Sequence, residues 1–169
     1  MERLRLPRFG LGCGSMTKYE NKAEYITTIH TALDAGINML NTADFYGSGM
    51  SEMVIGEALK ERKREDVFVS LKFGALTAPN GQMYGLDVKP FNIKNYLAHS
   101  LKRLNLDYVD LFQPARIDLG IPVEETVGAI AELVKEGYVK HIGMTQVDAE
   151  TLRRANKVHP ISLFDGEYS

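Results

Sequence analysis

The chain has 169 residues, of which 44% are hydrophobic and 25% are charged, an ordinary composition for a globular protein with one sizeable core. Its 20 basic and 22 acidic residues give a formal net charge of -2, which provides no electrostatic case for binding nucleic acid or an anionic membrane surface. We therefore expect the partner to be a small molecule or another protein.

The sequence predicts a soluble, cytoplasmic protein with one domain over residues 1–169. Cys13 is the single cysteine and cannot form an intramolecular disulfide, which fits a reducing compartment. Residues 1–7 lack the apolar core of a signal peptide, and no later stretch has the apolar length of a membrane span.

Short apolar runs alternate with longer amphipathic segments along the chain, a pattern typical of parallel βα units. Six of the short runs are rich in β-branched and aromatic residues and are expected to be strands: 11–13, 37–43, 67–74, 108–115, 139–145 and 161–167.

The segments between these runs have apolar residues at helical spacing. The stripes are Ile26, Ile29 and Leu33, then Leu97, Leu101 and Leu104, then Val123, Val127, Ile130 and Val134. Gly36, Pro122 and Gly137 stand where helix ends are expected. The longest irregular stretch, residues 75–90, contains Pro79-Asn80-Gly81 and is predicted to be a loop after the third strand.

Several motifs follow one another in a fixed order. Asn41 to Gly47 reads NTADFYG and is followed by Ser51-Glu52 and by Ile55 to Leu59, which reads IGEAL. Later come VFVSLKFG from Val67, DYVDLF from Asp107 and GYVKHIG from Gly137. These motifs cover nearly the whole chain and resemble, in order, the aldo-keto reductase family.

The resemblance implies an α/β fold of the (β/α)8 TIM-barrel type, incomplete here, with about six of eight βα units. A closed barrel needs eight strands and typically about 250 residues, so we expect a domain truncated at its C-terminal end. The part not encoded would include family residues that stack on the nicotinamide and hold the 2'-phosphate of NADPH. Unpaired strand edges predict self-association or pairing with another chain.

The resemblance also implies an NADP(H)-dependent oxidoreductase that moves hydride between a nicotinamide and a carbonyl or alcohol substrate. Tyr46 would be the general acid, and the positive charge of Lys72 would stabilise its tyrosinate. The residues support this assignment, because Lys72 shares a strand face with Ser70 and Phe68, opposite an apolar face. Both candidates stand at or just after the carboxyl ends of predicted strands, where barrel enzymes place their chemistry.

Two further catalytic positions depart from the family pattern. Asn41 replaces an aspartate, and Ala115 replaces a histidine. Asn41 can hydrogen-bond Lys72 but cannot pair with its charge, so we expect Lys72 to be less firmly anchored. Asp44 has suitable chemistry at a different spacing, and Ala115 removes one donor to the reacting oxygen. Asparagine and alanine here also resemble an atypical branch of the family.

The residues that the resemblance assigns to the nicotinamide carboxamide are Thr145, Gln146 and Asp165. Thr145 and Gln146 retain hydrogen-bonding capacity, whereas Asp165 replaces an amide with an acceptor-only carboxylate. Gly12, Cys13 and Gly14 end the first predicted strand, where they would either let the backbone approach the nicotinamide or simply form a tight turn. The four histidines lack metal-ligand spacing, and we expect no metal site.

Two alternatives to a reductase remain open. One is a catalytically silent relative that acts as a binding or assembly scaffold, favoured by Asn41, Ala115, Asp165 and the absent C-terminal units. The other is an unrelated barrel enzyme in which Lys72 forms a Schiff base.

Overall fold

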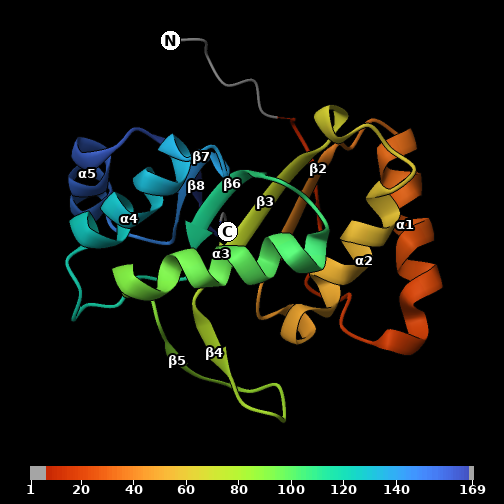
Figure 1. Cartoon of the computed structure of the whole chain (residues 1–169), viewed down its shortest axis with the longest axis horizontal. Helices are drawn as coiled ribbons and strands as arrows, with labels where there is room; N and C mark the ends of the chain where they lie inside the picture. The colour runs from red at the N-terminus through yellow and green to blue at the C-terminus, as the bar shows by residue number, and fades with distance from the viewer. Residues whose placement is uncertain (1–6, 168–169) are drawn as a thin grey trace.

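Strands and helices alternate from Gly10 to Asp165 in the computed structural model, which describes residues 7–167. The strands of the main sheet are β1 (Gly10–Gly12), β2 (Met39–Ala43), β3 (Phe68–Phe73), β6 (Val109–Pro114), β7 (Val139–Thr145) and β8 (Ile161–Asp165). The α-helices are α1 (Lys22–Asp34), α2 (Met50–Leu59), α3 (Pro90–Leu104), α4 (Val123–Lys135) and α5 (Ala149–Val158). Figure 1 shows these helices beside one another along the sheet in chain order.

The main sheet is entirely parallel, with the strand order β1-β2-β3-β6-β7-β8. Successive strands are therefore neighbours, as in the wall of a (β/α)8 barrel. Within residues 7–167, β1 and β8 each have a neighbouring strand on one side only. The fold is thus an incomplete barrel of six parallel strands, as the sequence predicted.

The core lies between the sheet and its helices. Val69, Leu71 and Phe73 alternate along β3 and are completely buried, which confirms the expected apolar face of this strand. The ring of Phe73 stacks on that of Phe112 in β6, with 4.3 Å between their centroids. Large buried side chains of this kind provide most of the favourable free energy of folding, because they remove apolar surface from water.

The prediction of a loop at residues 75–90 was wrong. β4 (Ala75–Thr77) and β5 (Met83–Leu86) form an antiparallel hairpin, which projects beyond the carboxyl end of β3 (Figure 1). Its turn contains Asn80-Gly81, where Gly81 has a φ of 83° and the Asn80 side chain accepts a hydrogen bond from the Gln82 amide at 3.0 Å. Asn-Gly between strand-forming residues is a strong hairpin signal, and the sequence analysis read it only as a loop.

Five of the six strands have boundaries that differ from the prediction. β1 is Gly10–Gly12 instead of 11–13, β2 starts at Met39 instead of 37, and β8 ends at Asp165 instead of 167. β3 and β6 are each one residue shorter at both ends than the predicted 67–74 and 108–115. Pairing with the neighbouring strand sets these limits, and apolar composition cannot show where that pairing starts or stops.

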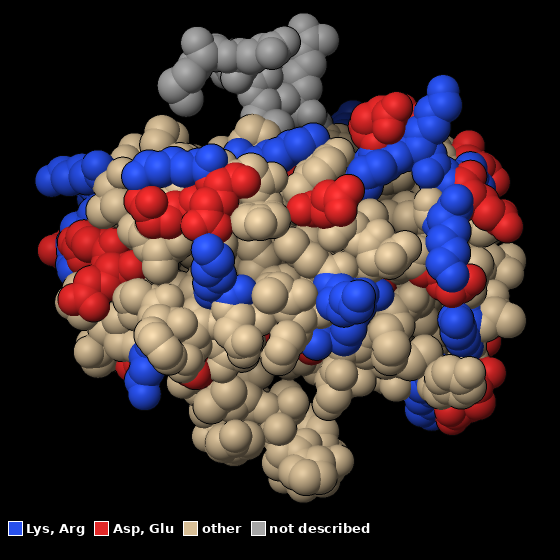
Figure 2. Space-filling model, in the orientation of Figure 1, with Lys and Arg blue, Asp and Glu red and all other residues tan. Residues whose placement is uncertain are grey.

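The surface in Figure 2 carries lysine, arginine and acidic side chains interspersed over the visible face. The hairpin at its lower edge is largely uncharged. No helix within residues 7–167 is long and apolar enough to cross a membrane.

Candidate active site at the carboxyl end of the sheet

Tyr46 lies in the turn that follows β2. The ladder between β2 and β3 continues one residue past Ala43, since the Asp44 amide donates to the Lys72 carbonyl at 3.0 Å. Tyr46 then begins a short 3-10 segment, Tyr46–Gly49, in which Gly47 and Ser48 have φ values of 58° and 52°. A Cβ at position 47 would be 2.8 Å from the Thr17 backbone, so this tight turn requires glycine.

Lys72 is the penultimate residue of β3 and lies beside Tyr46. Its ammonium nitrogen is 5.7 Å from the centroid of the Tyr46 ring, a cation–π distance. The Phe45 ring packs edge-on against Tyr46, with 4.9 Å between centroids. The structure therefore brings together the two residues assigned to catalysis, at the end of the sheet where barrel enzymes carry their chemistry.

The side chains of Tyr46 and Lys72 both line one cavity, which has a volume of about 330 Å³. The cavity is lined by Phe45, Tyr46, Lys72, Ala75, Met83, Ala115, Arg116, Thr145, Gln146 and Asp165. Four of these residues were not predicted from the sequence: Phe45, Ala75, Met83 and Arg116. Met83 reaches the cavity from β5, so recognising the Asn-Gly turn as a hairpin could have suggested its position.

Lys72 has an ionic partner on β8, the edge strand of the sheet. Its ammonium nitrogen lies 3.4 Å from Oδ2 of Asp165 in β8, and the two side chains are 14% and 33% exposed. Asn41 could hydrogen-bond Lys72, but its buried Oδ1 atom has no hydrogen-bond partner among residues 7–167. Lys72 was expected to be less firmly anchored because Asn41 replaces an aspartate. The sequence analysis did not foresee that Asp165, distant in sequence, provides an anionic partner.

Asp44 borders the site as a largely buried carboxyl group. Burial raises its pKa to about 7, and the nearby Glu52 carboxylate adds to this effect. Asp44 also accepts a hydrogen bond from the Gly74 amide at 3.4 Å, which links the turn after β2 to the end of β3.

Thr145, Gln146 and Asp165, the three residues assigned to the nicotinamide carboxamide, all line the cavity. The Thr145 hydroxyl is buried and has no hydrogen-bond partner among the described residues. The main-chain amide of Gln146 donates a hydrogen bond to the main-chain carbonyl of Asp165 at 2.9 Å, so the ends of β7 and β8 are joined here. An unsatisfied hydroxyl, a side-chain amide and a carboxylate match a ligand that both donates and accepts hydrogen bonds, as a carboxamide does.

The remaining cofactor candidates, Gly12, Cys13 and Gly14, are not among the residues that line this cavity. The Cys13 side chain is completely buried in the core, where burial raises its thiol pKa to about 12. Gly14, in contrast, approaches the Tyr46 ring. Within residues 7–167, no three histidine, cysteine or acidic side chains are grouped so that they could hold a metal ion.

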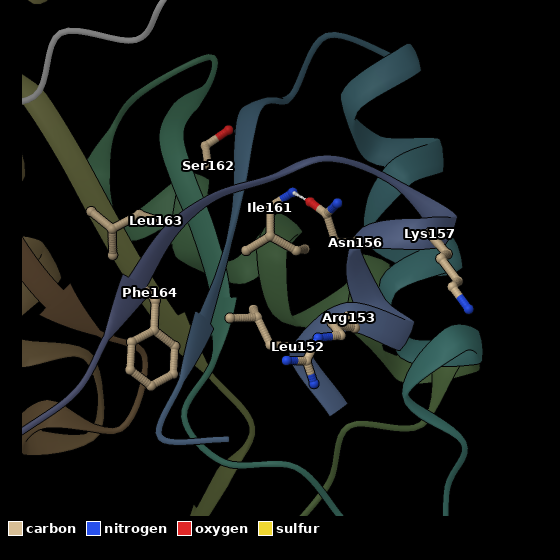
Figure 3. Close-up of a pocket in the computed structure, with 8 residues that line it drawn as sticks. All are labelled: Leu152, Arg153, Asn156, Lys157, Ile161, Ser162, Leu163 and Phe164. Atoms are coloured by element: carbon tan, nitrogen blue, oxygen red, sulfur yellow. Dashed lines mark hydrogen bonds between the residues drawn. The ribbon is translucent and has the colours of Figure 1, made fainter. Parts of the chain in front are cut away.

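A separate groove lies at the open edge of the sheet, where α5 meets β8 (Figure 3). It is lined by Leu152, Arg153, Asn156, Lys157, Ile161, Ser162, Leu163 and Phe164. The Asn156 side chain accepts a hydrogen bond from the Ile161 amide at 2.9 Å and so ties the helix to the start of β8. Phe164 is 48% exposed, which leaves an aromatic side chain in solvent beside the sheet edge.

A curved parallel sheet in strand order, with a tyrosine and a lysine meeting at its carboxyl end, defines part of a (β/α)8-barrel protein with the site on the usual face. The model of the Aldo/keto reductase family matches residues 8–169. The chain belongs to the aldo/keto reductase family.

Curated relatives agree with this assignment. The chain is 36% identical over 166 residues to Probable aldo-keto reductase 1 of Glycine max, covering 96% of this chain and 48% of that protein. It is 42% identical over 151 residues to Aldo-keto reductase str7 of Strobilurus tenacellus, covering 89% of this chain and 43% of that protein. The chain thus spans about half the length of these relatives.

Solved structures show the same relationship. The glycerol dehydrogenase AKR11B4 of Gluconobacter oxydans superposes with a TM-score of 0.87 at 28% identity, covering 98% of this chain and 53% of that one. An aldo-keto reductase of Klebsiella pneumoniae in complex with NADPH gives a TM-score of 0.73 at 25% identity, covering 88% of this chain and 49% of that one.

Proposed function

We propose that this chain carries the catalytic half of an NADP(H)-dependent oxidoreductase that interconverts carbonyl compounds and alcohols. The observation that supports this function best is the meeting of Tyr46 and Lys72 in one cavity, from two neighbouring strands. The family membership supports the same reaction class, and the Klebsiella pneumoniae relative in complex with NADPH supports the choice of cofactor.

In this proposal Tyr46 is the proton donor and acceptor. Its hydroxyl gives a proton to the substrate oxygen when a carbonyl is reduced, and takes it back when an alcohol is oxidised. The adjacent Lys72 ammonium favours the tyrosinate that forms after proton donation. Ala115 offers no side-chain donor to the substrate oxygen, so Tyr46 carries more of that interaction than it would beside a histidine.

Thr145, Gln146 and Asp165 would hold the carboxamide of a bound nicotinamide, because all three residues line the cavity and the Thr145 hydroxyl has no other partner among residues 7–167. The reduced nicotinamide, when bound, supplies the hydride. Gly14 would contribute backbone near Tyr46, whereas the buried Cys13 would contribute only through its main chain.

The test is a fluorescence titration of the purified chain with NADPH, followed by an assay of aldehydes and ketones by NADPH consumption. We expect saturable binding by wild type and by Tyr46→Phe, which keeps the ring and removes the hydroxyl, but carbonyl-dependent consumption only by wild type. Size-exclusion chromatography checks that both proteins are folded. Equal turnover by the two proteins, or no binding by a folded chain, would contradict the proposal.

A second candidate is an assembly role through the open edges of the sheet. It is favoured by β1 and β8, which have one neighbouring strand each within residues 7–167, and by the exposed ring of Phe164. Unpaired strand edges carry free backbone donors and acceptors that can pair with another chain. The whole chain would then self-associate through these edges.

Light scattering coupled to size exclusion, over a range of protein concentrations, tests this second candidate. We expect Phe164→Lys to lower the association constant, because it places a charge on the edge strand β8 itself. Leu119→Lys is a suitable control, since Leu119 is also exposed and belongs to the segment after β6, which is not an edge strand. A monomer at all concentrations would exclude self-association.

A further inference from the structure

Lys72 and Asp165 lie on strands that are not neighbours. β3 and β8 are separated in the sheet by β6 and β7, yet the lysine nitrogen and the aspartate oxygen are 3.4 Å apart. The curvature of the sheet brings the ends of β3 and β8 toward each other across its concave face. Among the described residues that line the cavity, Asp165 is the only acid.

No other carboxylate near the site pairs with Lys72 within residues 7–167. Asp44, the nearest acid in sequence to Tyr46, accepts a hydrogen bond from the Gly74 amide instead. Asn41 lies on β2, paired with Ser70, and its buried oxygen has no hydrogen-bond partner in the described part of the chain. The charge that balances the lysine therefore comes from β8 and not from β2.

We propose that Asp165 is the counter-ion that positions Lys72 over Tyr46. It would take the role that an aspartate at position 41, on β2, would otherwise have. The inference rests on the proposed function, since it concerns the lysine that would assist Tyr46. A lysine ammonium has three donors, so pairing with one aspartate oxygen leaves donors available toward the tyrosine hydroxyl. Asp165 is thus a positioning residue that acts through Lys72.

The test measures how fast Lys72 is acetylated by a small amine-reactive ester at one fixed pH, followed by peptide mass spectrometry. The reagent attacks the amine nitrogen, so a carboxylate that contacts this nitrogen and holds it in place slows the reaction. Asp165→Asn, which keeps the shape and removes the charge, is expected to raise the rate about threefold, as for loss of a partly exposed ion pair. Asp107→Asn is the matched control, because Asp107 is exposed before the start of β6.

A second variant separates charge from shape. Asn41→Asp combined with Asp165→Asn places an anion on β2 instead of β8, and it should return the rate to that of wild type. Lys102 and Lys157 are exposed and serve as internal references in the same digest. An unchanged rate in Asp165→Asn, or no rescue by the double variant, would overturn the proposal.

A uniform rise at all three lysines would also overturn the proposal, because it would mean that Asp165 only supports the fold. The measurement needs neither cofactor nor turnover. It can therefore succeed where the NADPH titration fails, and the two proposals are judged separately.

Discussion

Gly14 lies directly against the ring of Tyr46. A Cβ added at Gly14 would be 3.3 Å from Cζ of the tyrosine and 3.4 Å from Cε2, closer than most Cβ contacts. The absence of a side chain at this position thus helps to set where the proposed acid stands over the cavity.

Gly14→Val is expected to displace the Tyr46 ring while leaving the free energy of unfolding nearly unchanged, because Gly14 is exposed and only the ring needs to move. The measurement is the chemical shift of the Tyr46 ring in protein with 13C-labelled tyrosine, assigned by comparison with Tyr46→Phe. Gly12→Val is the control, since a Cβ at Gly12 would meet no atom within 4 Å. An unmoved Tyr46 signal in Gly14→Val would disprove the role of this contact.

Asp44 should make the folded protein less stable as the pH rises. Its pKa is about 7 in the folded protein against 3.8 for a free aspartate, so the folded state binds the proton more tightly. Its stabilising contribution is therefore complete below about pH 3.8 and is lost as the pH rises toward 7. Asp44→Asn, which stays neutral, should gain stability relative to wild type across this interval, on the order of a few kcal/mol.

Urea unfolding of wild type and Asp44→Asn at pH 5 and pH 8 measures the difference. Asp148 provides a control of opposite sign, because a hydrogen bond from the Thr151 amide lowers its pKa at the start of α5. Asp148→Asn should lose the same stability at pH 5 and pH 8, because both values lie above 3.8, where the contribution of a carboxyl with a lowered pKa is already complete. If the gap between Asp44→Asn and wild type is the same at both pH values, Asp44 does not titrate as described.

The Glu52–Arg103 ion pair should be among the most sensitive to mutation. Glu52 is completely buried in α2, and Arg103 of α3 donates to its Oε2 atom, while Oε1 has no partner among the described residues. Arg103→Leu leaves a buried carboxylate without its counter-ion, and we expect a loss of about 3–5 kcal/mol in unfolding free energy. Urea denaturation measures this loss.

Glu52→Leu combined with Arg103→Leu should recover much of that stability, because the uncompensated charge is then gone. Arg154→Leu, which breaks the exposed pair between Arg154 and Glu124, should cost far less. Similar losses for Arg103→Leu and Arg154→Leu would show that burial of Glu52 does not control the effect.

The sequence by itself determined the parallel βα architecture and the placement of the proposed catalytic pair. Apolar periodicity reports on which residues face a core, and this face is set locally by strand and helix geometry. The NTADFYG motif and the alternation around Lys72 therefore sufficed to place Tyr46 and Lys72 at the carboxyl ends of neighbouring strands. The hairpin at Asn80-Gly81 also has a local signal, because Asn-Gly favours a tight turn between two strands.

Only the tertiary structure decided which charges and contacts complete the site. Lys72 and Asp165 are 93 residues apart, and their contact depends on the curvature accumulated over four strands. The burial of the Cys13 side chain, the approach of Gly14 to Tyr46 and the lack of a partner for the Thr145 hydroxyl among residues 7–167 likewise depend on how distant segments pack. Local sequence patterns do not specify these distances, because the distances arise from the summed twist and register of the sheet.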